Sequence, residues 1–297
     1  MEGQPNPPSP FISKLKLLLK IVVTVVCLWY VFSKLDFKEI WIALKTANWL
    51  WLFLALIIYT ISKLLGAKRL TIYFKNIGIH LPEWQNIKLY WLGMFYNLFL
   101  PGAITGDAYK VVLLSKKYAV PYKKTTTAVL LDRFSGLLSL GLIVAVYSSF
   151  VLKEKTYIVI LISGAVLAIP LLYFIIKKIF PDFLTSFWPT FFIGAVVQIA
   201  ILLCVYCILY ALNITTDINS YVFIFLIAVV ASVLPISVGG GLGVREFVII
   251  EGAKYAGLEQ HTALVLSILF YLVTVTCSLA GMIYVFRNPL ENKPVNN

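Results

Sequence analysis

Charged side chains are scarce in this sequence, and most of those present are basic. Only 13% of the 297 residues are charged and 61% are hydrophobic, whereas about a quarter of the residues in a soluble domain are charged. A soluble protein with so little polar surface would precipitate, so lipid must be the solvent for most of the chain. The longest polar stretches, residues 1–14, 63–88 and 288–297, leave no room for a separate catalytic domain.

Histidine and cysteine are also rare. The two histidines, His80 and His261, lie far apart, and no Asp-rich or His-rich cluster accompanies them. We therefore predict no metal site and no cofactor, and because no nucleophile–base pair can be assigned we do not expect an enzyme. Cys204 and Cys207 have the CxxC spacing of redox and zinc motifs, but they lie in an apolar segment and are interpreted as small apolar helix residues.

Long apolar runs take the place of these missing features. Six of them approach or exceed the roughly 20 residues that a spanning helix needs: 15–33, 48–65, 127–152, 157–176, 188–212 and 262–286. Two further runs, 87–115 and 219–256, are broken by proline and glycine. No small-residue cleavage site follows the first run, which predicts an uncleaved helix with its start inside. The fold class is therefore an all-α polytopic membrane protein.

The basic residues decide how the broken runs lie. The net charge of +12 comes from Lys and Arg in short segments beside apolar runs. This pattern indicates that the basic segments stay on the cytoplasmic side of the membrane, and it favours that interpretation over nucleic-acid binding. Segments 63–88 and 110–124 are both rich in Lys, so both are predicted to be cytoplasmic. The chain between them would enter the membrane and return, as a re-entrant hairpin with its tip near Leu100–Asp107. The same reasoning makes 219–256 a re-entrant hairpin from the outer face; the alternative is that proline and glycine only kink two ordinary helices.

Two halves of matching plan and opposite orientation result, residues 15–152 and 157–286. Together they form a single predicted transmembrane domain, 15–287, between a disordered cytoplasmic N-terminus (1–14) and a cytoplasmic tail (288–297). Short helices broken at corresponding places in two inverted repeats point to a transporter binding site. The predicted location is the cytoplasmic membrane, with both termini inside.

The first tip combines helix breakers with charge. Pro101 and Gly102 would stop the inbound helix, and Thr105 or Asp107 could cap the outbound one. Lys110 follows Asp107 by three residues, so the two can pair on one helical face. The start of such a helix attracts anions, phosphate in particular. Asp107 serves either as a simple cap or in handling substrate or protons.

The second tip is rich in glycine and ends in a charged pair. Four glycines between 239 and 243 allow tight turns and a close approach of ligand to backbone. Arg245 and Glu246 open a helix expected from 244 to about 256, and because adjacent residues do not face each other on a helix, each is expected to need a partner elsewhere. Charged residues inside a membrane are costly and are functional by default.

A third charged pair, Asp132 and Arg133, is expected about one turn inside the helix that begins near Thr127. It is either an interfacial ion pair that snorkels to water or a source of partners for the first tip. Because a guanidinium binds phosphate through two hydrogen bonds, Arg133 and Arg245 are the preferred headgroup contacts. The full set of candidate substrate-binding residues is Asn97, Pro101, Gly102, Gly106, Asp107, Lys110, Asp132, Arg133, Pro235, Ser237, Gly240, Gly241, Gly243, Arg245 and Glu246.

These motifs resemble the lysylphosphatidylglycerol synthase/flippase transmembrane family over essentially the whole chain. The resemblance lies in Asn97…Leu-Pro-Gly102…Gly106-Asp107, in Leu131-Asp-Arg-Phe-Ser-Gly136, and in Leu234-Pro-Ile-Ser237 with the glycines up to Arg245-Glu246; Ala67-Lys-Arg69 also matches. The family often has Gly-Gly-Asp with an arginine three residues later, where this chain has Thr105-Gly-Asp107 and Lys110. No soluble aminoacyl-transferase domain follows residue 287, so the resemblance implies lipid translocation and not lysyl transfer.

The leading functional prediction is a flippase for an anionic or phosphate-bearing lipid, with membrane lipids as its partners. Two alternatives stay open: a membrane enzyme that modifies lipid headgroups, and a non-transporting scaffold. A homo-oligomer or a membrane partner is possible, whereas nucleic acid is not expected.

Overall fold

The computed structural model describes residues 37–100, 104–232 and 244–290. The predicted first span, 15–33, lies outside these residues. The described helices are α2 (Phe37–Thr46), α3 (Trp49–Lys75), α4 (Glu83–Phe99), α5 (Thr105–Tyr118), α6 (Tyr122–Val151), α7 (Lys155–Ile179), α8 (Phe187–Ala211), α9 (Ile218–Ser232), α10 (Val244–Tyr255), α11 (Gln260–Leu279) and α12 (Ile283–Phe286). Two 3-10 turns, η1 (Pro181–Ser186) and η2 (Ala280–Met282), precede α8 and α12.

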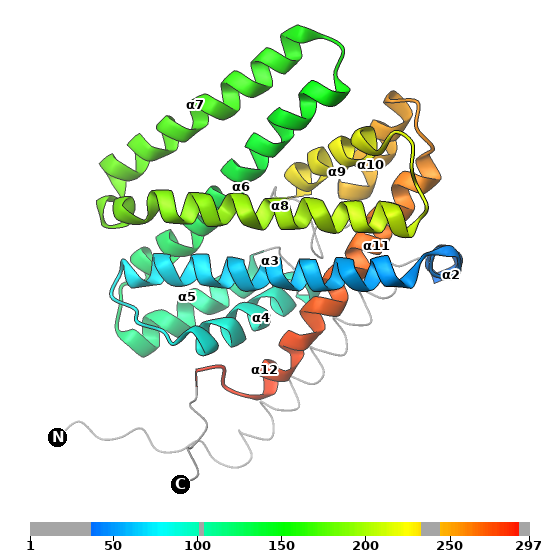
Figure 1. The fold of residues 1–297 in the computed structure, drawn as a ribbon. Helices are drawn as coiled ribbons and strands as arrows, with labels where there is room; N and C mark the ends of the chain where they lie inside the picture. The colour runs from blue at the N-terminus through cyan, green and yellow to red at the C-terminus, as the bar shows by residue number, and fades with distance from the viewer. Residues whose placement is uncertain (1–36, 101–103, 233–243, 291–297) are drawn as a thin grey trace, which may run out of the picture.

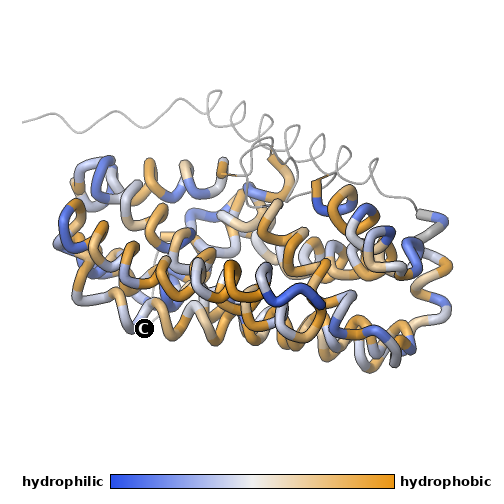
Figure 2. The backbone as a smooth tube through the Cα atoms, turned by 90° about the horizontal axis from the view of Figure 1, so that it is seen from above, coloured by the Kyte–Doolittle hydropathy of each residue, from blue (hydrophilic) through white to orange (hydrophobic). Residues whose placement is uncertain are grey.

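Five of the described segments are long and apolar enough to cross a membrane: Trp49–Lys75, Tyr122–Val151, Lys155–Ile179, Pro181–Ala211 and Gln260–Phe286. They correspond to five of the six predicted spans, and the part of the chain that the structure describes contains no strand. The all-α membrane class is therefore confirmed. Figure 2 shows hydrophobic segments through the middle of the bundle and many of the hydrophilic ones toward its two ends.

Helices α3 and α8 run antiparallel, side by side, across the front of the bundle in Figure 1. The backbone N–H of Asn48, just before α3, donates to the carbonyl of Ala211 at the end of α8 (2.8 Å). At the opposite ends the Tyr73 and Thr190 hydroxyls lie 2.9 Å apart. These two helices occupy equivalent places in the two predicted halves, so their antiparallel packing agrees with an inverted repeat.

The connections expected on the cytoplasmic side lie together at one end of the bundle. Lys124, at the start of α6, pairs with Asp182 of η1 (3.0 Å). The Lys117 ammonium, at the end of α5, donates to the carbonyl of Leu290 after α12 (2.9 Å). Asn76, after α3, donates to Ser186. The ends that loop charge assigns to one face of the membrane thus meet in space.

Helix α3 is longer than the sequence suggested. We expected residues 63–88 to be a polar loop, but α3 continues to Lys75, and Gly78 then provides the positive φ of 78° in the turn to α4. The prediction was wrong because it placed all the charged side chains of this segment in water. Arg69 is instead buried and paired inside the protein, and Lys63 lies in the middle of the helix.

Two pairs of short helices complete the bundle. Helices α4 and α5 pack against each other, as do α9 and α10. None of the four has more than 17 residues, so each is shorter than the roughly 20 residues of a spanning helix. Their breaks fall where the two tips were predicted. Whether they are re-entrant in a bilayer stays a prediction.

Glycine allows α4 to approach the C-terminal segment closely. Gly281, in η2, lies against the backbone of Trp91, so a methyl group there would collide with the Trp91 carbonyl. Nearby, the Trp91 indole donates to the carbonyl of Cys277 (3.1 Å). Small residues at such contacts let helix backbones pack without a gap, which is the main source of attraction between helices in lipid.

We expect Gly281→Ala to lower the stability of the protein by about 1–3 kcal/mol, because the added methyl must push α4 and η2 apart. The measurement is thermal unfolding of the purified protein in detergent. Gly164→Ala on α7 is the control, since no atom lies within 4 Å of the added group. Equal melting temperatures for the two variants would contradict the close contact.

Candidate functional site

Asp107 is the centre of the first charged cluster. One carboxylate oxygen accepts from the Lys110 ammonium at 2.9 Å, and the other lies 2.5 Å from Nη2 of Arg133 on α6. Asp107 and Lys110 are buried, whereas the Arg133 side chain is 33% exposed. The sequence prediction that Arg133 reaches the first tip is therefore correct. Among the described residues, two cations therefore meet on one carboxylate.

Asn97, from α4, caps the start of α5, where a residue of α5 was expected to do so. Its side-chain oxygen accepts from the backbone N–H of Gly106 (2.8 Å), while Ile104 occupies the N-cap position. The expectation that Thr105 or Asp107 caps the helix was wrong, because a side chain of the preceding helix satisfies the free N–H. Asp107 is thereby left free to pair with cations.

Glycines bring α4 and α5 together beside this cluster. A Cβ on Gly106 would collide with the carbonyl of Gly93, and a Cβ on Gly93 would collide with the Lys110 side chain. The Lys110 ammonium lies over the ring of Tyr90, 4.9 Å from its centroid, which is a cation–π contact. Lys110 is thus held by a carboxylate and an aromatic face together.

Asp132 belongs to a different pair. It accepts from Nε of Arg69 on α3 (2.7 Å), and both side chains are buried. Asp132 and Arg133 do not form the interfacial ion pair that was one of the two alternatives, because Asp132 pairs with Arg69 and Arg133 pairs with Asp107.

The Arg69 guanidinium fills a space that two glycines leave open. A Cβ on Gly136 or on Gly194 would lie 3.2 Å from Nη1. That nitrogen is buried and has no hydrogen-bond partner among the described residues. Arg69 was recognised in the sequence only as part of a basic patch, since nothing in the local pattern signals a partner 63 residues away.

Arg245 and Glu246 do pair with each other, contrary to expectation. Nη2 of Arg245 donates to a carboxylate oxygen of Glu246 (2.9 Å). Both side chains turn toward Ser267 on α11, whose hydroxyl accepts from Arg245 (2.8 Å) and donates to Glu246 (3.0 Å). A shared third residue therefore brings neighbours together that the helix alone would separate. The guanidinium also lies over the ring of Tyr271, 5.5 Å from its centroid.

Seven of the candidate residues lie outside the described part of the chain. They are Pro101, Gly102, Pro235, Ser237, Gly240, Gly241 and Gly243. Among the described residues, no group of three or more His, Cys, Asp or Glu side chains comes together that could hold a metal ion.

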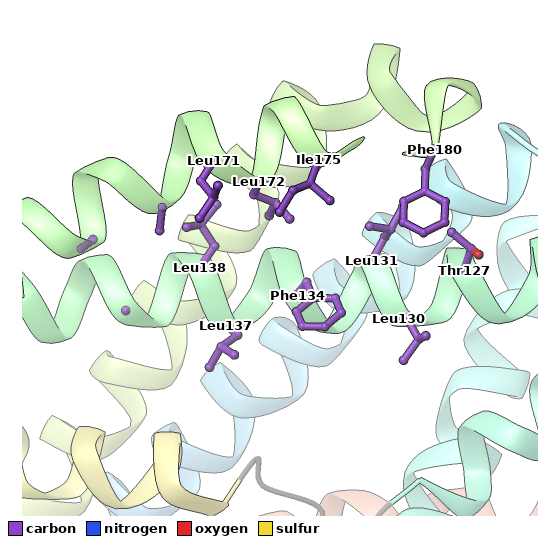
Figure 3. A pocket seen from close by; sticks show the side chains of 13 residues that line it. Thr127, Leu130, Leu131, Phe134, Leu137, Leu138, Leu171, Leu172, Ile175 and Phe180 are labelled. Carbon is purple, nitrogen blue, oxygen red and sulfur yellow. The ribbon is translucent and has the colours of Figure 1, made fainter. Parts of the chain in front are cut away.

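An apolar groove of about 460 Å³ lies between α6 and α7 (Figure 3). Leu130, Phe134 and Leu137 line it from α6, and Leu171, Leu172 and Ile175 line it from α7. Leu130 and Leu137 are three and four residues from Arg133 and so lie one helical turn to either side of it. On α6 the groove runs from Thr127 to Gly141, so Arg133 lies alongside its middle without lining it.

The chain matches a known protein family. The family model described as lysylphosphatidylglycerol synthase TM region matches residues 17–281, which include every charged cluster described above. No curated protein matches the chain.

Asp132→Leu is expected to destabilise the protein by about 3–5 kcal/mol, because it leaves the Arg69 charge buried without a partner. The double variant Arg69→Met/Asp132→Leu should recover most of that loss, since no charge remains buried. Thermal unfolding in detergent measures both. Asp182→Ala, which breaks an exposed pair with Lys124, should cost at most about 1 kcal/mol. A double variant no more stable than Asp132→Leu would show that the pairing is not the cause.

Proposed function

The chain belongs to the lysylphosphatidylglycerol synthase transmembrane-region family, and we propose that it moves an anionic, phosphate-bearing lipid across the cytoplasmic membrane. It is a multi-pass membrane protein, and its family associates it with membrane lipids. The lipid class, the direction of movement and the absence of a covalent step belong to the proposal.

Surplus positive charge inside the bundle is the observation that supports this proposal most. The three clusters contain Arg69, Lys110, Arg133 and Arg245 against Asp107, Asp132 and Glu246, and Lys63 adds a further cation in the middle of α3. Together with Lys63, the clusters therefore contain five cations and three carboxylates in the part of the chain that the structure describes. Each unpaired charge at membrane depth costs about 2.5–3.5 kcal/mol on insertion scales. An anionic headgroup offsets that cost, whereas a cationic or neutral substrate does not.

Arg133 is the cation best placed to meet the headgroup first. Its side chain is partly exposed, while Arg69 and Arg245 are buried. A guanidinium can give two parallel hydrogen bonds to a phosphate. Lys110, on the same carboxylate, adds a second positive charge nearby. The phosphate would therefore bind at the Asp107 cluster.

The groove between α6 and α7 suits the acyl chain of the same lipid. Except for Thr127, its lining consists of apolar side chains and one glycine. Since two lining residues, Leu130 and Leu137, lie about one helical turn from Arg133, a lipid with its phosphate on that arginine can lay a chain along the groove. Helix α7 has one buried residue, Ile176, and so lies at the lipid-facing edge of the bundle (Figure 1).

The two short helix pairs would form re-entrant hairpins that approach the middle of the membrane from opposite faces. The end of the bundle with Lys117 and Lys124 would be cytoplasmic, by the positive-inside rule. Charged clusters in both hairpins then provide one anion site in each half. Rocking of one half against the other would expose them in turn, as in transporters built from inverted repeats.

We expect Arg133→Gln to slow translocation of an anionic lipid by about tenfold or more, because it removes a charge-assisted contact to phosphate. The assay uses liposomes containing the purified protein and fluorescent phosphatidylglycerol, with chemical bleaching of the outer leaflet. Lys124→Gln, which removes an exposed cation, should translocate at the wild-type rate. Well-folded wild-type protein that moves no lipid headgroup at all would rule out the proposal.

Filling the groove should slow the same movement without unfolding the protein. Gly141 lines the groove and has no atom within 4 Å of an added Cβ, so Gly141→Phe should occupy space intended for an acyl chain and remove its packing contacts. We expect translocation to fall several-fold. Gly164→Phe is the matched control, on an equally open site outside the groove. Equal rates in the two variants would exclude the groove from the lipid path.

A further inference from the structure

We propose that Lys63 is an additional phosphate-binding residue, midway between the two charged hairpin clusters. This inference rests on the proposed function and identifies the point at which the anionic headgroup passes from one half of the protein to the other. The sequence had assigned Lys63 to a cytoplasmic loop.

Lys63 lies at the middle of α3. It is 14 residues from the start of the helix at Trp49 and 12 residues from its end at Lys75. At 1.5 Å per residue these separations are about 21 Å and about 18 Å. The helix is therefore longer than a hydrocarbon core of about 30 Å, and a helix that spans the core about its own middle has Lys63 well inside it.

Among the described residues, no carboxylate pairs with Lys63. Its ammonium lies over the ring of Tyr59, one turn earlier on α3, at 4.4 Å from the ring centroid, in a cation–π interaction. The side chain is half-buried, and an aromatic face stabilises a cation without neutralising it. A charged side chain in the middle of a membrane-spanning helix is functional by default.

An aromatic residue connects Lys63 with the first cluster. The Tyr90 hydroxyl packs on α3 at Gly66, where an added Cβ would lie 2.6 Å from it. Gly66 is three residues after Lys63, on the same face of the helix. The ring of Tyr90 in turn lies under Lys110. Tyr90 therefore contacts Lys110 and also reaches α3 one helical turn from Lys63.

A second aromatic contact connects Lys63 with the other cluster. The Tyr59 ring packs edge-on against Phe270, with centroids 5.6 Å apart. The Arg245 guanidinium lies over Phe270, 5.9 Å from its centroid. Cations and aromatic faces thus alternate in the order Lys110, Tyr90, Lys63, Tyr59–Phe270 and Arg245.

This order suits the passage of an anion. Transport requires binding that is strong enough to admit the ion and weak enough, over several sites, to release it. Of the three cations only Lys63 lacks a carboxylate partner among the described residues, so a phosphate can bind there without displacing one. An ammonium on a flexible stem binds phosphate as a point charge and can follow it over a short distance.

The test compares Lys63→Met, Lys63→Arg and Lys75→Met in full-length protein. Lys75 is an exposed cation at the end of the same helix and serves as the matched control. The first measurement is translocation of fluorescent phosphatidylglycerol in liposomes. The second is the rise in melting temperature in detergent on addition of dihexanoyl-phosphatidylglycerol, compared with dihexanoyl-phosphatidylcholine. The melting temperature without lipid reports whether each variant is folded.

We expect Lys63→Met to slow translocation by about tenfold or more and to reduce the stabilisation specific to phosphatidylglycerol. Lys63→Arg should retain most of both, and Lys75→Met should match the wild type. If Lys63→Met matches the wild type in both measurements, the inference is overturned while the proposed function stands.

The two proposals fail in different ways. If the wild type moves no lipid but its specific stabilisation by phosphatidylglycerol is lost in Lys63→Met, the phosphate site is supported and translocation is not. If that stabilisation persists in Lys63→Met, or is missing from the wild type, Lys63 is not a phosphate site.

Discussion

A charge inside an apolar bundle must find a partner, and in this chain the partners come from different helices. Arg69 and Asp132 join α3 to α6, and Asp107 and Arg133 join α5 to α6. Helix association in lipid gains little from the hydrophobic effect, because lipid tails are as apolar as the helix surfaces. Ion pairs and close glycine contacts therefore have a larger share in fixing which helices touch than they would in water.

The same pairing places charge at equivalent points in the two halves. Asp107 is the third residue of α5 and Arg245 is the second residue of α10, so each short second helix begins with charged residues. Each cluster also has a fixed partner from a long helix, Arg133 of α6 in one half and Ser267 of α11 in the other. The long helices thus hold the charged ends of the short ones, which is what a site at the junction of two repeats requires.

Hydropathy and loop charge were enough to predict most of the long helices, because a span needs only length and apolar composition. They failed where a polar residue is satisfied inside the protein. Residues after Leu65 were taken for a loop, although Arg69 is paired with a residue on α6. Arg245 and Glu246 were expected to separate, since the helix rule does not include a third residue such as Ser267. Partners distant in sequence leave no local signal, so the candidate residues could be named but not connected.

Asp107 has a consequence for release as well as for binding. Without it, Lys110 and Arg133 would present two bare cations to a phosphate, and low dielectric would make that complex tight. With it, a phosphate bound as we propose would compete with a carboxylate that already contacts both cations. As the phosphate left, the carboxylate would restore both ion pairs. Binding at the proposed site would be reversible for that reason, and reversible sites on each side of Lys63 would let a headgroup move on instead of remaining bound.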